Sequence, residues 1–462
     1  MTLEAASGKR KVLAKRFLEG PLSSRELHRL GVADYFEEEL HHAECSSAYK
    51  PSELHRSSWL PAVAPPPNLF PYQEEIVDDL LQTCNDPSFE SGLLSLPTGG
   101  GKTTTALSFL LRWIESADRP ASILWLAPRR ELLEQAALEL RRLWFSGYRP
   151  IPLMIGKPES LNEGQGTPDH HSVRFTTAEQ LLSEGTGHET QVRHDYIVFD
   201  EAHQAIAPGR LRLLVDLCRR SRTRLLGLSA TPGRTSPSET RSLVSLFSGN
   251  LFYPHSLRPN AIHALQSAGV LAQLRFRNLA RETGSHAPKG GVSTGGWLIE
   301  SLSLDNSRFQ ACLQALAEEF GQGRLTLAFC GSVVHSAALA AACRASCIPA
   351  ASLTGDDSPA YRVSILESFR QGKIRVLCNA KLLTMGYDLP RLDSILLTTP
   401  VNSPIQFEQI VGRVSRGPAC GGTEVGHVLD LDNHLDRLGL PSSYHRFEDF
   451  DWKQYQGMDT QD

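Results

Sequence analysis

The segment from Pro97 to Thr104 combines residue types that bind phosphate. It contains three consecutive glycines, a lysine and three threonines. Glycines let backbone N–H groups approach a phosphate, a lysine reaches the terminal oxygens, and a hydroxyl beside it can ligate Mg²⁺. The segment follows the apolar residues 93–96 and precedes a helical pattern, which is the setting of a phosphate-binding loop. The predicted nucleotide contacts are Pro97, Thr98, Gly99, Gly100, Gly101, Lys102, Thr103 and Thr104, with Lys102 also catalytic and Thr103 a ligand of Mg²⁺.

A pair of carboxylates supplies the second half of a hydrolytic site. Asp200 and Glu201 follow the apolar residues 196–199, at the predicted carboxyl end of a strand. An acidic side chain at that position meets the metal beside a phosphate-binding loop. We predict that Asp200 holds Mg²⁺ and that Glu201 orients and deprotonates the attacking water. Together with the loop, the pair predicts nucleotide hydrolysis.

These groups must be positioned by parallel strands, because the strand patterns are short, apolar and separated by helical patterns. One such helix spans residues 130–143 and places Leu132, Ala136, Leu140 and Leu143 on one face, as a crossover helix requires. The predicted strands lie at residues 93–96, 123–126, 196–199 and 225–228, and then at 326–329, 350–353, 374–377, 394–397 and 427–429. Helices are also predicted around 336–345 and 359–371. The pattern predicts two α/β domains with doubly wound parallel sheets.

The domain boundaries follow from changes in composition. A proline-rich stretch at 61–67 separates a small helical N-terminal region, residues 1–62, which could form a helix-turn-helix or a solvated helical pair. The first α/β domain is predicted at 63–255, an interdomain connection at 256–305, the second domain at 306–440 and a C-terminal tail at 441–462.

The overall composition limits the function classes. With 462 residues, 41% hydrophobic and 21% charged, the chain has enough apolar material for packed cores. The nine cysteines are scattered without a CxxC pair, so a reducing cytoplasm is expected and a zinc site is not. No apolar stretch is long enough to span a bilayer. A net charge of −4 gives no global attraction to nucleic acid, so such binding needs a local face.

Further motifs occur in the order found in one known family. They lie at residues 70–73, 127–132, 175–177 and 229–232 in the first half, and at 328–332, 384–390 and 409–416 in the second. Together with the loop and the acidic pair, they resemble the motifs of superfamily 2 DEAD/DEAH-box helicases and translocases. Residues 262–272 resemble a segment of the RadD, XPB and restriction-translocase branch. The resemblance implies two tandem RecA-like domains.

The resemblance also implies roles for individual residues. ATP would lie between the two domains, with Arg413 and Arg416 of motif VI acting on its γ-phosphate. Further ATP-site positions carried over from the family are Tyr72, Gln73, Gly386, Asp388 and the catalytic Gln409. The residues that would couple hydrolysis to strand binding are His203, Ser229 and Thr231. The family-like positions for nucleic-acid contact are Arg129, Thr177, Gly331, Ser332, Thr354, Gly355 and Thr384.

The predicted function is that of an ATP- and Mg²⁺-dependent helicase or translocase acting on DNA, single-stranded or duplex, in repair, recombination or anti-phage defence. Two alternatives stay open. The same domains could form an ATP-controlled DNA-binding switch or scaffold subunit that recruits a nuclease or another partner. An RNA-remodelling helicase is the other alternative.

Overall fold

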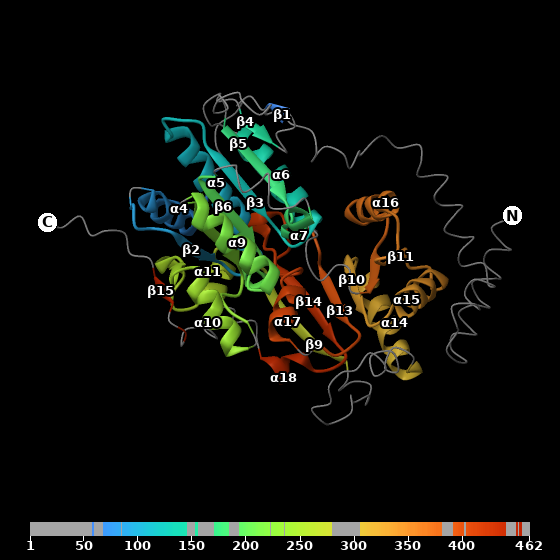
Figure 1. Ribbon diagram of the computed structural model, residues 1–462. Coiled ribbons are helices and arrows are strands. Elements are labelled where there is room, and N and C mark those ends of the chain that lie inside the picture. The colour runs from blue at the N-terminus through green and yellow to red at the C-terminus, as the bar shows by residue number, and fades with distance from the viewer. Residues whose placement is uncertain are drawn as a thin grey trace. The chain divides into compact units, whose positions relative to one another are not determined.

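The computed structural model describes residues 58–59, 68–84, 86–145, 153–155, 171–183, 194–221, 223–234, 236–279, 305–380, 391–401, 403–439, 450 and 452–454. The described residues form two compact units that meet in sequence at residues 265–266, and residues 450–454 belong to the first of them (Figure 1). Most of the predicted N-terminal helical region lies outside the described residues, as do Thr384, Gly386 and Asp388.

The first unit contains a nine-stranded sheet in the order β1-β4-β5-β3-β6-β7-β2-β8-β15. All neighbouring strands are parallel except β1 and β4. The strands are β1 (Ser58–Trp59), β2 (Ser91–Ser95), β3 (Ser122–Leu126), β4 (Leu153–Ile155), β5 (His171–Thr176), β6 (Tyr196–Asp200), β7 (Arg224–Ser229), β8 (Asn250–Phe252) and β15 (Lys453–Gln454). The central strands β2 and β6 are buried along their whole length, as strands covered on both faces must be.

Helices of the first unit pack along this sheet. They are α4 (Pro71–Thr83), α5 (Lys102–Ser116), α6 (Arg130–Phe145), α7 (Ala178–Ser183), α9 (Pro208–Ser221), α10 (Pro237–Leu246) and α11 (Ala261–Ser267), with 3₁₀ turns at Ala202–Gln204 and His255–Leu257. Helix α5 lies between α4 and α6 and contacts β2 and β7. It buries eight side chains, among them Phe109, Leu110 and Ile114, so its position is fixed by a large apolar face.

The second unit contains a six-stranded parallel sheet in the order β11-β12-β10-β13-β14-β9. The strands are β9 (Gln273–Asn278), β10 (Thr326–Cys330), β11 (Ala350–Leu353), β12 (Val376–Ala380), β13 (Ser394–Leu397) and β14 (Val425–Asp430). The helices are α14 (Asn306–Gly321), α15 (Val333–Ala345), α16 (Pro359–Arg370), α17 (Pro404–Val411) and α18 (His434–Leu438), with a 3₁₀ turn at Pro418–Cys420. Strand β9 falls inside the segment 256–305 that the sequence predicts as a connection, so part of that segment belongs to the second sheet.

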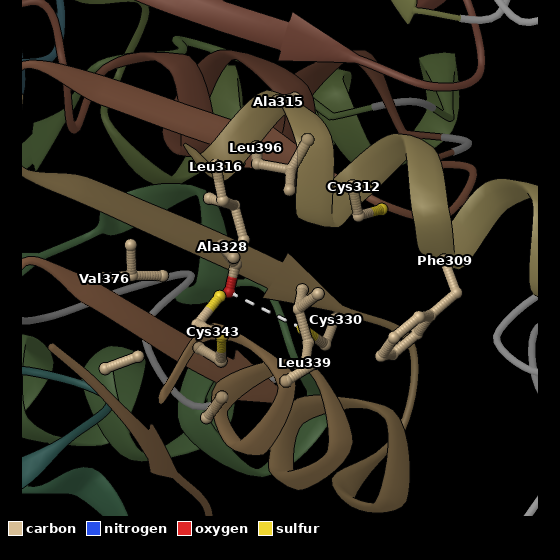
Figure 2. Close-up of a cluster of buried hydrophobic side chains, with 14 of the residues drawn as sticks. Phe309, Cys312, Ala315, Leu316, Ala328, Cys330, Leu339, Cys343, Val376 and Leu396 are labelled. Carbon is tan, nitrogen blue, oxygen red and sulfur yellow. Dashed lines mark hydrogen bonds between the residues drawn. The ribbon is translucent and has the colours of Figure 1, made fainter. Parts of the chain in front are cut away.

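The core of the second unit lies between its sheet and helices α14 and α15. Figure 2 shows side chains from α14 and α15 meeting those of β10, β12 and β13. Four of the buried side chains are cysteines that behave as small apolar groups: Cys312, Cys330, Cys343 and Cys378. Burial raises the pKa of the Cys312 and Cys343 thiols, so both stay protonated.

The predicted architecture is confirmed: two parallel sheets, each flanked by helices, stand in tandem as in RecA-like helicase domains. Within the described residues, no helix has both the length and the apolar character needed to cross a membrane.

Candidate active site

Three neighbouring strands bring the predicted catalytic groups to one edge of the first sheet. Strand β7 lies between β2 and β6, with Ser95 opposite Ser229 and Leu228 opposite Asp200. The carboxyl ends of parallel strands meet at the same sheet edge, where ligands of open α/β sheets bind. The loops that follow β2, β6 and β7 are therefore adjacent in space, although their residues are far apart in the sequence.

The loop between β2 and α5 has a backbone that only glycine adopts easily. Gly99 and Gly101 have φ angles of 86° and 81°, in the left-handed region. A Cβ atom on Gly101 would lie 2.4 Å from Nε2 of Gln73, and one on Gly100 would lie 3.0 Å from the carbonyl oxygen of Pro97. Helix α5 begins at Lys102, and the first N–H groups of a helix have no intrahelical acceptor. The loop and the helix start thus fit a phosphate group.

Helix α4 fixes this loop from the side. The Tyr72 hydroxyl donates to the carbonyl oxygen of Gly100 at 2.9 Å, and Nε2 of Gln73 donates to that of Gly101 at 3.5 Å. The other end of the Gln73 amide, Oε1, accepts from the backbone N–H of Phe70 at 3.0 Å. The Phe70 and Tyr72 rings are stacked, with centroids 5.8 Å apart. Both ends of the Gln73 amide contact the protein, so this side chain positions the loop.

Lys102 is half-buried and interacts electrostatically with the two acidic residues. Its Nζ donates to the carbonyl oxygen of Leu96 at 3.2 Å. Burial lowers the pKa of Lys102, while the charges of Glu201 and Asp200 act to raise it. The loop and the acidic pair therefore interact electrostatically, as a site for a charged ligand requires.

The two carboxylates stand on a constrained backbone. Glu201 has a φ of 53°, and its N–H donates to Oδ1 of Asp200 at 2.9 Å. Burial raises the pKa of Asp200, and the neighbouring negative charge of Glu201 raises it further. Asp200 is buried and Glu201 is half-buried, and two carboxylates beside Lys102 are groups that suit a divalent cation. Asp200 and the hydroxyl of Thr103, at the start of α5, carry oxygen atoms of the kind that Mg²⁺ prefers as ligands.

A buried contact chain joins the acidic pair to the loop after β7. Nδ1 of His203 lies 3.3 Å from Oε2 of Glu201 and 3.3 Å from Oγ of Ser229. The Ser229 hydroxyl donates to the carbonyl oxygen of Thr231 at 2.7 Å and accepts from the Thr231 N–H at 3.1 Å. The Ser229 hydroxyl has one proton, and it donates that proton to Thr231. Nδ1 of His203 must therefore be the donor in the contact between His203 and Ser229. Burial lowers the pKa of His203, which favours the neutral ring.

Thr104 was predicted to contact the nucleotide, and the structure gives its hydroxyl another partner. It donates to Oε1 of Glu139 on α6 at 2.7 Å, and Arg142 binds both oxygens of the same carboxylate at 2.8 Å. This link joins the helix of the phosphate loop to the helix that follows residues 127–129. Sequence reasoning missed it, because a threonine and a glutamate so far apart in the chain form no pattern.

The second unit holds the helix of the predicted motif VI. Gln409 is buried on α17, while Arg413 and Arg416 follow the end of that helix. The segment before α17 is fixed by His434, whose Nε2 accepts from the Val401 N–H at 2.6 Å and whose ring stacks on Phe407.

Three hydroxyls predicted to contact nucleic acid lie at the beginnings of helices or in a turn. Thr177 accepts from the N–H of Gln180, and Ser332 accepts from that of His335, both at 3.1 Å. The Thr354 hydroxyl donates to the carboxylate of Asp357 at 3.0 Å. Gly331 and Gly355 are on the same loops as Ser332 and Thr354, and Arg129 directly precedes α6.

Two protein families match this chain, and the regions that they match contain most of the site residues described above. The family described as "Type III restriction enzyme, res subunit" matches residues 67–234, and the family described as "Helicase conserved C-terminal domain" matches residues 307–417. The first region contains the phosphate loop, the acidic pair and the loop after β7. The second contains most of the second sheet and the helix of motif VI.

Individual relatives are distant. The chain is 25% identical over 395 residues to "Putative mitochondrial ATP-dependent helicase irc3" of Schizosaccharomyces pombe, covering 80% of this chain and 58% of that protein. It is 26% identical over 371 residues to the "Type I restriction enzyme EcoKI endonuclease subunit" of Escherichia coli K12, covering 70% and 31%. The fold resembles the "ATP-dependent Type ISP restriction-modification enzyme LlaBIII bound to DNA", with a TM-score of 0.59, 16% identity and coverage of 83% and 30%.

The chain thus spans little more than half the length of the first of these relatives and about a third of the other two. The two family regions follow one another in the order of the two parallel-sheet units. The chain belongs to the superfamily 2 helicases and translocases and is related to their restriction-translocase branch.

Proposed function

We propose that this chain is an ATP- and Mg²⁺-dependent motor that translocates along DNA, in repair, recombination or defence against foreign DNA. The observation that carries the proposal is the meeting of Lys102, Asp200 and Glu201 at one sheet edge, beside a loop with two glycines in the left-handed region. Phosphoryl transfer depends almost entirely on positioning and charge stabilisation, and this arrangement supplies both.

Each group has a distinct part in the proposed reaction. The loop amides and Lys102 hold the phosphates, Thr103 and Asp200 hold Mg²⁺, and Glu201 accepts a proton from the attacking water. Bound Mg²⁺ would neutralise phosphate charge. The remaining proposed ATP-site groups are Tyr72, Gln73, Pro97, Thr98, Gly386, Asp388, Gln409, Arg413 and Arg416. Arginine suits the γ-phosphate because its guanidinium fork binds two oxygens at once.

DNA as the polymer is supported by the relatives, since two of the three are restriction enzymes and one is bound to DNA. The proposed contacts Arg129, Thr177, Gly331, Ser332, Thr354, Gly355 and Thr384 are suited to a phosphate backbone, which is bound without reading sequence.

The test is steady-state ATP hydrolysis by the purified chain alone and with single-stranded DNA, duplex DNA, forked DNA and RNA. Salt is kept low and fixed, because it screens phosphate contacts. We expect strong stimulation by DNA. Stronger stimulation by RNA would reject the DNA proposal in favour of RNA remodelling, and ATP binding without any stimulation would reject an autonomous motor.

A second function is supported by one relative. The chain is 26% identical to a restriction endonuclease subunit, and by this likeness its two domains would form an ATP-controlled switch that recruits a nuclease. A triplex-displacement assay separates the two functions. Movement along DNA displaces the third strand, whereas a switch stays bound in the presence of ATP without displacing it.

Replacing Tyr72 with phenylalanine should weaken ATP binding, because the carbonyl of Gly100 loses its donor and the loop is less well held. A lost neutral hydrogen bond is worth ~1 kcal/mol, so we expect the KM for ATP to rise about fivefold with little change in kcat. Tyr196→Phe is the control, because its hydroxyl contacts Cys84 and Arg224 away from the loop. An equal rise of KM in both variants would reject a specific role for Tyr72.

Replacing Ser229 with alanine should lower DNA-stimulated turnover more than turnover without DNA. The change removes the hydroxyl that holds Thr231 and contacts His203, so the loop after β7 loses its link to the acidic pair. We expect a loss of about five- to tenfold in stimulated kcat, from one or two buried hydrogen bonds. Ser91→Ala is the control on neighbouring β2, because its hydroxyl contacts only Ser248 among the described residues. An equal loss with and without DNA would contradict a coupling role.

A further inference from the structure

Residues 453–454, near the end of the given sequence, form a strand of the first sheet. Strand β15 pairs in parallel with β8, with Lys453 opposite Asn250 and Gln454 opposite Leu251. The N–H of Lys453 donates to the carbonyl oxygen of Gly249 at 2.7 Å. This attachment uses backbone atoms. The side chain of the preceding residue, Trp452, is not needed for it.

Trp452 instead contacts the loop that follows β7. Its indole N–H donates to the carbonyl oxygen of Pro232 at 2.9 Å, across 220 positions of the sequence. Pro232 directly follows Thr231, which is bonded to Ser229. A contact chain therefore runs from the indole through this loop to His203 and on to Glu201.

The contact is specific to this part of the chain and is not implied by the family. Pro232 lies inside the first matched region, 67–234, whereas Trp452 lies beyond the second, which ends at 417. The loop between β7 and α10 is irregular, and side chains from outside hold it at two points. The Thr240 hydroxyl accepts from the Arg234 N–H at 3.0 Å, and Trp452 binds Pro232. An irregular loop with few such contacts opens locally at a low free energy, so the loss of one contact should raise its rate of hydrogen exchange.

We propose that Trp452 is a positioning residue that holds the Ser229–Pro232 loop in contact with His203, and that it thereby sets how strongly DNA stimulates ATP hydrolysis. The effect on hydrolysis rests on the proposed function. The effect on the conformation of the loop is independent of the proposed function, because it is measured in the protein without ATP or DNA.

The test compares Trp452→Phe, which keeps an aromatic ring and removes the donor, with Lys453→Ala on the same strand. The Lys453 side chain is exposed and its backbone pairing is kept, so this control should match the wild type. Hydrogen exchange of the 229–234 amides should be about fivefold faster in Trp452→Phe, with β3 unchanged. Stimulated kcat should fall about fivefold, with the KM for ATP unchanged.

A second variant tests the same hydrogen bond if the smaller phenylalanine ring destabilises the whole sheet. Incorporating 3-benzothienylalanine at position 452 replaces the indole N–H with sulfur and preserves the size of the ring system. Unchanged exchange at 229–234 in this variant would overturn the positioning role. Faster exchange with unchanged stimulated kcat would overturn the coupling role. Faster exchange in a protein whose wild type is not stimulated by DNA would refute the motor proposal and retain the positioning of the loop.

Discussion

Replacing Lys102 with alanine should reduce DNA-stimulated ATP hydrolysis by about 10²–10³-fold, the typical effect of removing one preorganised charge-stabilising donor. In the structure Lys102 is the cation that interacts with both Asp200 and Glu201 at the end of the phosphate loop. Its position is fixed by the start of α5 and by the carbonyl of Leu96. Without it, the phosphate charge that develops in the transition state loses its nearest positive partner.

The control for this experiment is Arg112→Ala, which removes a cation from the same helix. Arg112 forms a partly exposed ion pair with Glu74, and such pairs contribute about 0–1 kcal/mol to stability. We expect normal turnover in this variant, and a retained fold in both, measured by thermal unfolding. Undiminished hydrolysis in Lys102→Ala would overturn the assignment of the phosphate-binding loop.

The arrangement of the central strands could be predicted from the sequence because their patterns are strong. Apolar stretches such as residues 93–96 and 196–199 are buried and are followed by the residues that we predict to bind a charged ligand. Because the carboxyl ends of these strands lie at the same sheet edge, the loop and the acidic pair must lie close together. This proximity can be predicted without knowing any side-chain contact.

Two of the edge strands, β9 and β15, could not be predicted in the same way. Strand β9 has the sequence Gln-Leu-Arg-Phe-Arg-Asn and no fully buried residue, so its composition favours a connection over a strand. It forms because β14 offers a free edge along its full length. Strand β15 has two residues, and its pairing with β8 depends on a neighbour about two hundred positions away. Neither strand carries a pattern of its own that a periodicity argument could detect.

The contacts that hold the site were also beyond prediction, although the residues themselves were singled out. The resemblance implies that Gln73 binds the nucleotide, but no sequence pattern predicts that its amide also joins Phe70 to Gly101. Thr104 contacts Glu139 on another helix. A single hydroxyl or amide can bond to any nearby polar group, so its partner depends on the tertiary packing. Residue type and position along a strand predict which groups meet, but not how they are held.

Replacing Glu201 with glutamine should leave ATP binding intact and slow hydrolysis by about 10²–10⁴-fold, the usual contribution of a general base. Glutamine keeps the length of the side chain and its contact distance to His203, but it cannot accept a proton from water. The change also removes the negative charge that raises the pKa of Asp200. Asp200 is then more fully ionised at a given pH, so its interaction with Mg²⁺ should be at least as strong as before.

We therefore expect Glu201→Gln to change the rate of ATP hydrolysis without weakening the binding of ATP. The Kd for a fluorescent ATP analogue should be unchanged or lower, while single-turnover hydrolysis becomes slow, so that ATP stays bound to the protein. Glu134→Gln is the matched control, because Glu134 forms a partly exposed ion pair with Arg130 on α6 of the same unit and should affect neither measurement. Weaker ATP binding with normal turnover of the bound ATP would mean that Glu201 holds the cation and that another group takes the proton. Loss of both would instead place Glu201 in the structural support of the loop, through its contact with His203.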